Sequence, residues 1–450
     1  MRRSVLHLCS LIALVLGCGR RPPIDGPAFA ALSTLAPPQL PPPGRDVSNR
    51  FADDPAAARL GQELFFDRGF SGRLLDADND GTGATLGRAG ETARVACAGC
   101  HVPAAGFLDT RSPDKQISLA AGWGVRKTPS LLDVAQGTLF TWDGRRDSLH
   151  AQVFAPIETP VEMNASRLFV AEELARRYRA EYEALFGPMP PFEDPARFPP
   201  VTAVSTGCRP RYGQPKPGPC DGSFSGMPGD HGVYDSLAPA DQRAVDLAVI
   251  NFGKAIAAYE RKLSCGQSRF DRFMGGDAAA LTSSEQRGAS VFVGKGRCLS
   301  CHSGPYLSDH QFHDVGLGPR TVGVVFADLD DHGALVGLAA AIADPLNTRG
   351  AFSDGDDGRL PASVPSSLDG AFKTPMLRCV SQRPSFMHTA QLRTLAQVVE
   401  FFDRGGDGPG FFGTNELVPL GLAAEEKQDL VAFLRALDGP GPAPALLSPP

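Results

Sequence analysis

Two short motifs of cysteine and histidine carry the clearest chemistry in this chain. Both have the spacing C-x-x-C-H, and they comprise Cys97, Cys100, His101, Cys298, Cys301 and His302. In each motif two thiols can add across the vinyl groups of one haem, and the adjoining imidazole can ligate its iron. A redox C-x-x-C pair or a zinc site would not need histidine at the fifth position of both motifs. The sequence therefore predicts two covalent c-type haems, with His101 and His302 as proximal iron ligands.

A run of acidic residues could bind a different metal. Asp76, Asp78 and Asp80 precede Gly81 in a D-x-D-x-D-G loop of the kind that wraps calcium. The twelfth position of such a loop is normally a bidentate Glu, and here it is Gly87. A calcium site and a merely solvated acidic loop are both compatible with this incomplete ligand set.

The first residues predict a location outside the cytoplasm. Arg2 and Arg3 precede an apolar run over 5–16, which ends in Gly17 and Cys18. This pattern is typical of a lipoprotein signal peptide, with Cys18 as the lipidated first residue; an ordinary signal peptide containing a cysteine is the alternative. We expect a periplasmic protein anchored to the membrane by lipid. The net charge of −6, without a basic patch, gives no support for nucleic-acid binding.

Cysteines outside the haem motifs suggest disulfides. Cys9 lies in the signal peptide, Cys18 would carry the lipid, and four cysteines would attach haem. The remaining four are Cys208, Cys220, Cys265 and Cys379. An oxidising compartment allows up to two bridges among them, with three possible pairings. The local pair Cys208–Cys220, in a Pro/Gly-rich loop, is the first choice, which leaves Cys265–Cys379 by elimination. Buried free thiols are the alternative.

Helical periodicity dominates the remaining chain, so we predict a mainly α protein with long loops. Expected helices cover 56–66, 166–186, 241–263, 283–292, 394–402 and 424–437. Ser283 or Ser284 is the expected cap of the fourth, and Pro156 and Pro160 are expected to break helices. Residues 187–240 should be an irregular surface insertion, and 309–369 mostly loop.

The expected organisation has five parts. A signal peptide (1–17) and a Pro-rich extended tether (18–45) precede an N-terminal haem domain (46–264). A C-terminal haem domain (265–440) and a short tail (441–450) complete the chain.

An ordered series of motifs resembles the bacterial di-haem cytochrome c peroxidases and their relative MauG over most of residues 56–437. The series comprises Leu64–Asp67, Phe140–Arg145, Gln152, Pro156–Ile157, Pro160–Met163, His313–Gly316, Phe372–Pro375 and Met387–His388. The resemblance implies two cytochrome c-like domains with one haem each. It also implies that the haem on His101 is the peroxidatic one and that the haem on His302 transfers electrons.

The resemblance assigns three catalytic residues. Glu162 matches the distal acid-base carboxylate, Gln152 the amide of the same pocket, and Trp142 an electron relay between the haems. Splitting an O–O bond requires a proton to move from one oxygen to the other, which a carboxylate above the iron can accomplish.

Three departures from the family pattern change the expectations. Ile117 stands where classical peroxidases carry a histidine that blocks the first iron, so we expect an open iron, as in MauG. Phe402 stands where the second iron should find a Met or Tyr ligand, which leaves that iron five-coordinate or ligated by Met376, Met387 or His388.

The third departure concerns the family's calcium site between the haems. Lys127 replaces an Asn there, and Arg383 and Ser385 replace a Thr-x-Pro pattern. We predict that the two cations replace the ion and hold the domain interface electrostatically.

The leading functional hypothesis is reduction of hydrogen peroxide with electrons from a small periplasmic donor, a cytochrome c or a cupredoxin, through the second haem. A MauG-like oxidation of side chains on a partner protein is the alternative enzyme. A non-catalytic electron-transfer cytochrome is the third possibility, and Glu162 argues against it.

Overall fold

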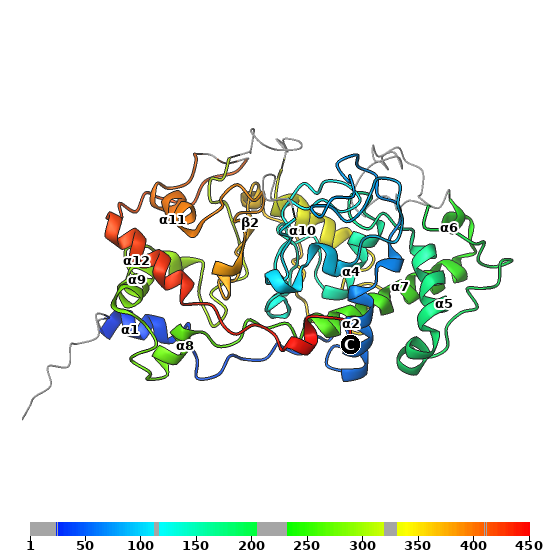
Figure 1. Cartoon of the computed structure of the whole chain (residues 1–450), viewed down its shortest axis with the longest axis horizontal. Helices are drawn as coiled ribbons and strands as arrows, with labels where there is room; N and C mark the ends of the chain where they lie inside the picture. Colours follow the sequence, from blue (N-terminus) through cyan, green and yellow to red (C-terminus); the bar gives the residue numbers. More distant parts are fainter. Residues whose placement is uncertain are drawn as a thin grey trace, which may run out of the picture.

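The computed structural model describes residues 24, 26–111, 117–204, 232–318, 331–408, 410 and 412–450. Two helical lobes lie side by side (Figure 1). The first lobe contains α2 (Pro55–Phe66), α3 (Cys97–Cys100), α4 (Leu149–Glu158), α5 (Arg167–Phe186), α6 (Val233–Ser236) and α7 (Pro239–Glu260). The second contains α1 (Gly26–Ser33), α8 (Arg269–Met274), α9 (Ser283–Val293), α11 (Leu395–Asp403) and α12 (Ala424–Arg435).

The remaining elements are short or lie between the lobes. Helix α10 (Ala334–Ala343) packs Gly337 against the backbone of Asp143, which belongs to the first lobe. Strands β1 (Phe312–His313) and β2 (Phe372–Lys373) pair antiparallel. Short 3₁₀ turns are η1 (Arg68–Phe70), η2 (Pro103–Ala105), η3 (Val134–Gln136), η4 (Cys298–Ser300), η5 (Ser366–Leu368), η6 (Val380–Gln382) and η7 (Pro444–Leu446).

Each lobe contains a close crossing of two helices. In the first lobe, a Cβ added to Gly61 of α2 would lie 1.9 Å from the Ala255 carbonyl oxygen of α7. In the second, a Cβ on Gly288 of α9 would lie 1.9 Å from the Asp429 oxygen of α12. Only glycine permits backbones this close. The helix that precedes each C-x-x-C-H motif, α2 or α9, thus packs closely against a second helix of its own lobe.

The apolar spacing that predicted the helices is also what builds the cores. Val245, Val249, Phe252 and Ile256 of α7 are all buried, at intervals of three and four residues. In the second lobe Phe433 of α12 contacts two other rings edge-on, at 5.2 and 5.3 Å between centroids. The six expected helices are confirmed, with boundaries within about three residues.

Several local predictions were wrong. The cap of α9 is Thr282, whose hydroxyl and Glu285 form a capping box, and not Ser283 or Ser284. Pro156 lies inside α4 instead of ending it. The stretch 309–369 is mostly loop in its described part, as predicted, and helix α10 is the main exception.

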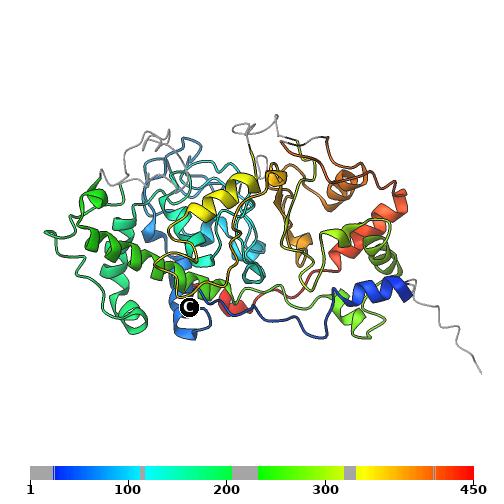
Figure 2. The same cartoon turned by 180° about the vertical axis from the view of Figure 1, so that it is seen from behind.

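The segment predicted as an extended tether is instead docked on the protein: its first part packs on the second lobe, and Gly44 accepts a hydrogen bond from Arg261 of the first lobe. Residues 26–33 form α1, and Leu32 and Leu35 are fully buried in the core of the second lobe. The Pro41 carbonyl accepts a hydrogen bond from Tyr306. The C-terminal tail runs from the second lobe back to the first, where Gln62 donates hydrogen bonds to two of its carbonyls. Both views show these segments running between the lobes (Figures 1 and 2).

The insertion at 187–240 is also less peripheral than predicted. Met189, Phe192 and Phe198 are buried in the core of the first lobe. Residues 205–231, including Cys208, Cys220 and His231, lie outside the described residues, so the pairing of Cys208 with Cys220 stays a prediction.

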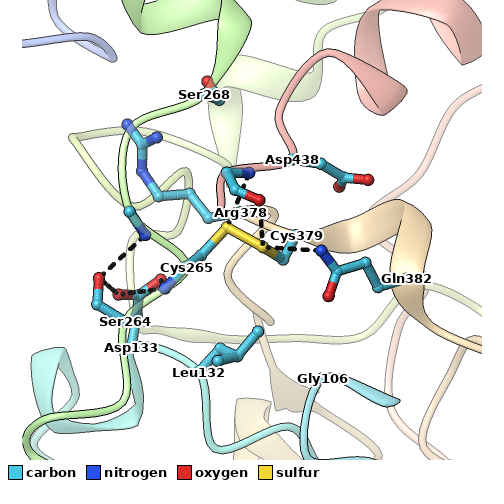
Figure 3. The surroundings of a disulfide bond; sticks show 12 residues. Gly106, Leu132, Asp133, Ser264, Cys265, Ser268, Arg378, Cys379, Gln382 and Asp438 are labelled. Atoms are coloured by element: carbon cyan, nitrogen blue, oxygen red, sulfur yellow. Dashed lines mark hydrogen bonds between the residues drawn. A yellow bond between two sulfur atoms is a disulfide. The ribbon is translucent and has the colours of Figure 1, made fainter. Parts of the chain in front are cut away.

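The other predicted disulfide is confirmed. Cys265 and Cys379 are bonded, with Cα atoms 5.8 Å apart, and the bridge is buried at the junction of the lobes (Figure 3). Asp133 of the first lobe accepts hydrogen bonds from the Cys265 amide and the Ser264 hydroxyl. The disulfide therefore ties the linker after α7 to the loop that begins η6.

Candidate haem sites

The first motif lies on a single helical turn after α2. Cys97 and Cys100 bound α3, and His101 is its C-cap. The imidazole Nδ1 of His101 donates to the Phe107 carbonyl at 3.3 Å. Because a carbonyl can only accept, this bond fixes the tautomer and leaves Nε2 with a lone pair for a metal.

The second motif repeats this arrangement. Cys298 begins η4, Cys301 is its C-cap, and His302 Nδ1 donates to the Leu307 carbonyl at 2.8 Å. A cavity of about 600 Å³ opens beside these residues, with largely aliphatic and aromatic walls. Its size is typical of a pocket for a large, flat cofactor. Leu395, Val398, Val399, Leu430 and Leu434 form one apolar wall.

Charge states at both motifs fit a haem. Burial lowers the pKa of His101 and of His302 to about 4, so both imidazoles are neutral, as iron ligation requires. Burial also raises the pKa of Cys97, Cys100 and Cys298 to about 12. Reactive redox thiols have the opposite shift, and neither C-x-x-C pair is joined as a disulfide. The residues therefore suit covalent attachment better than redox or zinc chemistry.

Two groups near Cys100 were missed by sequence reasoning. Arg111 lies 3.5 Å from the Cys100 sulfur and pairs with Asp109 at 2.8 Å. Burial is the main cause of the raised pKa of Cys100, and the charges of Asp109 and Glu162 add to it. Glu162 therefore lies within electrostatic range of the first motif. The spacing of Asp109 and Arg111 carried no recognisable signal.

The other predicted catalytic residues are positioned by α4 and its neighbours. Gln152 lies half-buried in the first turns of α4, which Ser148 caps. Glu162 follows the same helix, and its carbonyl accepts from the Ala121 amide at 3.0 Å. Trp142 lines the second cavity and donates from Nε1 to the Lys127 carbonyl at 2.7 Å.

Aromatic rings continue from Trp142 toward the second lobe. Its ring lies 6.4 Å from that of His388, which stacks on Phe372 at 3.6 Å. Arg126, placed 5.3 Å over Phe372, bridges Asp143 of the first lobe and Asp331. The interface between the lobes thus combines stacked rings with a buried ion-pair bridge.

The positions that depart from the family pattern lie in two kinds of environment. Ile117 belongs to a small buried apolar cluster with Leu119, Trp123 and Ala390. Phe402, Met376, Met387 and His388 all line the cavity at the second motif. The identity of a ligand opposite His302 stays a prediction.

The acidic loop is not gathered into a metal shell. Asp76 accepts from the Asp78 amide, Asp78 from Trp123 Nε1, and Asp80 from the Thr82 amide. In the part of the chain that the structure describes, the one group of three ligand atoms within 4.8 Å of one another is Cys301, Asp309 and His313. The solvated acidic loop is thus the better-supported interpretation, and calcium there stays a prediction.

The remaining histidines divide between core and cavity. His150 is fully buried, and His332 pairs with Asp369 at 2.6 Å. His310 lines the second cavity. His313 contacts Asp309 and Glu416 beside Cys301.

The proximal histidines and the apolar cavity fit a haem protein, and comparisons with known proteins specify its kind. A family profile described as di-haem cytochrome c peroxidase matches residues 55–205. The methylamine utilization protein MauG of Methylorubrum extorquens is 30% identical, over 85% of this chain and 78% of its own. The cytochrome-c peroxidase IdrP1 of Pseudomonas sp. (strain SCT) is 29% identical, over 91% and 89%.

Solved structures share the fold. A MauG-like protein associated with microbial copper homeostasis superposes with a TM-score of 0.58 at 22% identity, covering 92% of this chain and 98% of its own. The di-haem peroxidase BthA of Burkholderia thailandensis gives 0.57 at 21% identity, over 86% and 87%. The chain therefore belongs to the di-haem cytochrome c peroxidase and MauG family, and it is an oxidoreductase of the cytochrome-c peroxidase type.

Proposed function

We propose that this protein binds two covalent c-type haems and reduces hydrogen peroxide with electrons from a small periplasmic donor, a cytochrome c or a cupredoxin. The observation that carries the proposal is the duplicated proximal geometry, in which His101 and His302 each donate Nδ1 to a backbone carbonyl. Each imidazole thereby keeps Nε2 available to ligate the iron of a haem that the two preceding cysteines would attach covalently.

Three side chains have separate roles in the proposed reaction. A bound haem supplies the redox-active iron on which peroxide is reduced. Glu162 transfers a proton between the peroxide oxygens, and the Gln152 amide orients the substrate. Reduction of one peroxide to two waters consumes two electrons and two protons. Trp142, in the wall of the second cavity, relays the electrons from the His302 site to the His101 site.

A second candidate is the MauG-like oxidation of side chains on a partner protein. The observation that favours it is the apolar packing of Ile117, which offers no ligand to block the first iron. An electron-transfer cytochrome without catalysis is the third candidate. It has no use for a carboxylate within electrostatic range of Cys100.

The proposed location is the periplasmic face of a membrane, through a lipid on Cys18. Within the residues that the structure describes, no helix is long and apolar enough to cross a bilayer. Gly26, the first residue of α1, follows Cys18 by eight residues. Eight residues span at most about 28 Å, so a lipid on Cys18 would keep the second lobe close to the membrane.

Haem content and peroxide turnover test the proposal together. The purified protein should contain two haems by the pyridine haemochromogen assay, and Cys298→Ala/Cys301→Ala should contain one. Peroxide should oxidise an added reduced cytochrome c rapidly when the unmodified protein is present, and not when the variant replaces it. A long-lived oxidised species without donor turnover would favour the MauG-like candidate. Absence of any reaction with peroxide would overturn both enzymes.

A further inference from the structure

The cavity at His302 has an excess of buried positive charge. Lys127, Lys373 and Arg383 line it, and Glu416 is the one carboxylate among its described lining residues. Glu416 is half exposed and already accepts from His313 Nδ1 at 2.7 Å. A buried cation without a counter-ion is costly, so a cavity with this lining favours an anionic occupant.

The cations are held in place without being neutralised. Lys127 Nζ donates to the Ser385 carbonyl, and Arg383 donates to the Met376 carbonyl. Lys373 donates to the Leu139 carbonyl, in a different part of the cavity wall. Among the described residues, none of the three forms a salt bridge with a carboxylate. Backbone carbonyls orient these side chains but supply no formal negative charge to balance them.

Lys127 and Arg383 form a pair that spans the two lobes. Lys127 is 4% exposed and comes from the first lobe, whereas Arg383 follows η6 in the second. Burial, and then the charge of Arg383, lowers the pKa of Lys127 to about 7. After burial, the charge of Arg383 is the next contribution that lowers the pKa of His302, which places Arg383 near the proximal histidine.

Ser385 adds a neutral donor at the same place. Its side chain is 1% exposed, its Oγ has no hydrogen-bond partner in the structure, and it lines the cavity. Buried hydroxyls are nearly always hydrogen-bonded, so this one lacks an acceptor that the complete site would supply.

We propose that Lys127, Arg383 and Ser385 bind the propionate carboxylates of the haem attached at Cys298 and Cys301. The inference rests on the proposed function, because it requires a haem there. A haem carries two carboxylates, which match two cations and one hydroxyl donor in number and charge. Since one cation comes from each lobe, the bound cofactor links the lobes electrostatically. The pair also opposes the extra positive charge of ferric iron and so raises the reduction potential of this haem.

Spectroelectrochemical titration of the haem-loaded protein tests this. Lys127→Met and Arg383→Met should each shift the reduction equilibrium of the His302 haem about tenfold toward the ferric form, which is about 59 mV for one electron. The His101 haem should shift much less. Lys295→Met is the matched control, because Lys295 lies three residues before Cys298 but is exposed and paired with Glu426. Unchanged potentials in both variants, or an equal shift in the control, would overturn the proposal.

A measurement on the unmodified protein covers the case in which a variant fails to fold. With ¹³C-labelled propionates, the infrared difference spectrum should show both carboxylates ionised from pH 5 to pH 9, because each faces a cation. A protonated carboxyl band that titrates in this range would contradict the proposal. A protein with one haem would instead refute the proposed function, so the two failures are distinguishable.

Discussion

Glu260, the last residue of α7, gives the sharpest prediction about stability. Its side chain is buried, its Oε2 has no hydrogen-bond partner, and its charge contributes to the raised pKa of Cys97, after burial. Burial raises the pKa of Glu260 from 4.5 to about 8. The folded protein therefore holds this proton more tightly than the unfolded chain does.

The sign follows from proton linkage. The neutral Glu260 carboxyl contributes fully to the free energy of unfolding below pH 4.5. This contribution is lost as the pH rises toward 8, because the carboxyl ionises at lower pH in the unfolded chain than in the folded protein. At about 1.4 kcal/mol per pH unit, the loss reaches about 3 kcal/mol at pH 7. Glu260→Gln is nearly isosteric and cannot ionise. The unfolding free energy of this variant, relative to that of the unmodified protein, should therefore rise by about 3 kcal/mol between pH 5 and pH 8.

Urea unfolding of the haem-loaded proteins, followed by circular dichroism at pH 5, 6, 7 and 8, measures this difference. Glu181→Gln is the matched control, because Glu181 is exposed on α5 and the same substitution there should leave the pH dependence unchanged. The reasoning is refuted if the unfolding free energies of Glu260→Gln and the unmodified protein change in parallel over this range.

Three further predictions address the irons, the disulfide and the interface. Electron paramagnetic resonance of the ferric protein should show a high-spin His101 haem, since Ile117 cannot ligate, and a low-spin bis-histidine signal from that haem would disprove the open site. Removal of the Cys265–Cys379 bridge by paired alanine substitutions should lower the unfolding free energy by about 5 kcal/mol, because the bridge closes a sequence separation of 114 residues; an unchanged urea midpoint would contradict this. Elemental analysis should find no calcium between the haems of the unmodified protein but one calcium in Lys127→Asn/Arg383→Thr, which removes both cations; tightly bound calcium in the unmodified protein would refute their replacement of the ion.

Sequence alone predicted those features that depend on local pattern. The C-x-x-C-H motifs and the apolar spacing of α7 could be recognised in the sequence, whereas the pairing of Cys265 with Cys379, 114 residues apart, was reached only by elimination. The cap of α9 was also visible in principle, because Thr282 and Glu285 have capping-box spacing.

Features that depend on distant packing could not be predicted in this way. Phe198 is fully buried, yet it stands among prolines and shows no helical period. Leu32 and Leu35 are apolar residues in a Pro-rich segment, and only the core of the second lobe explains their burial. Lys127 and Arg383 were placed together at the domain interface only by the family resemblance, and the cavity that both line is seen only in the structure.

The most direct test of the central claim is stopped-flow mixing of hydrogen peroxide with the haem-loaded protein and with Glu162→Gln. If the His101 site is peroxidatic and Glu162 transfers the proton, the rate constant should fall by about 10²- to 10⁴-fold while haem content stays at two. Full peroxide reactivity in Glu162→Gln would contradict the assignment of this carboxylate and of the catalytic site built around it.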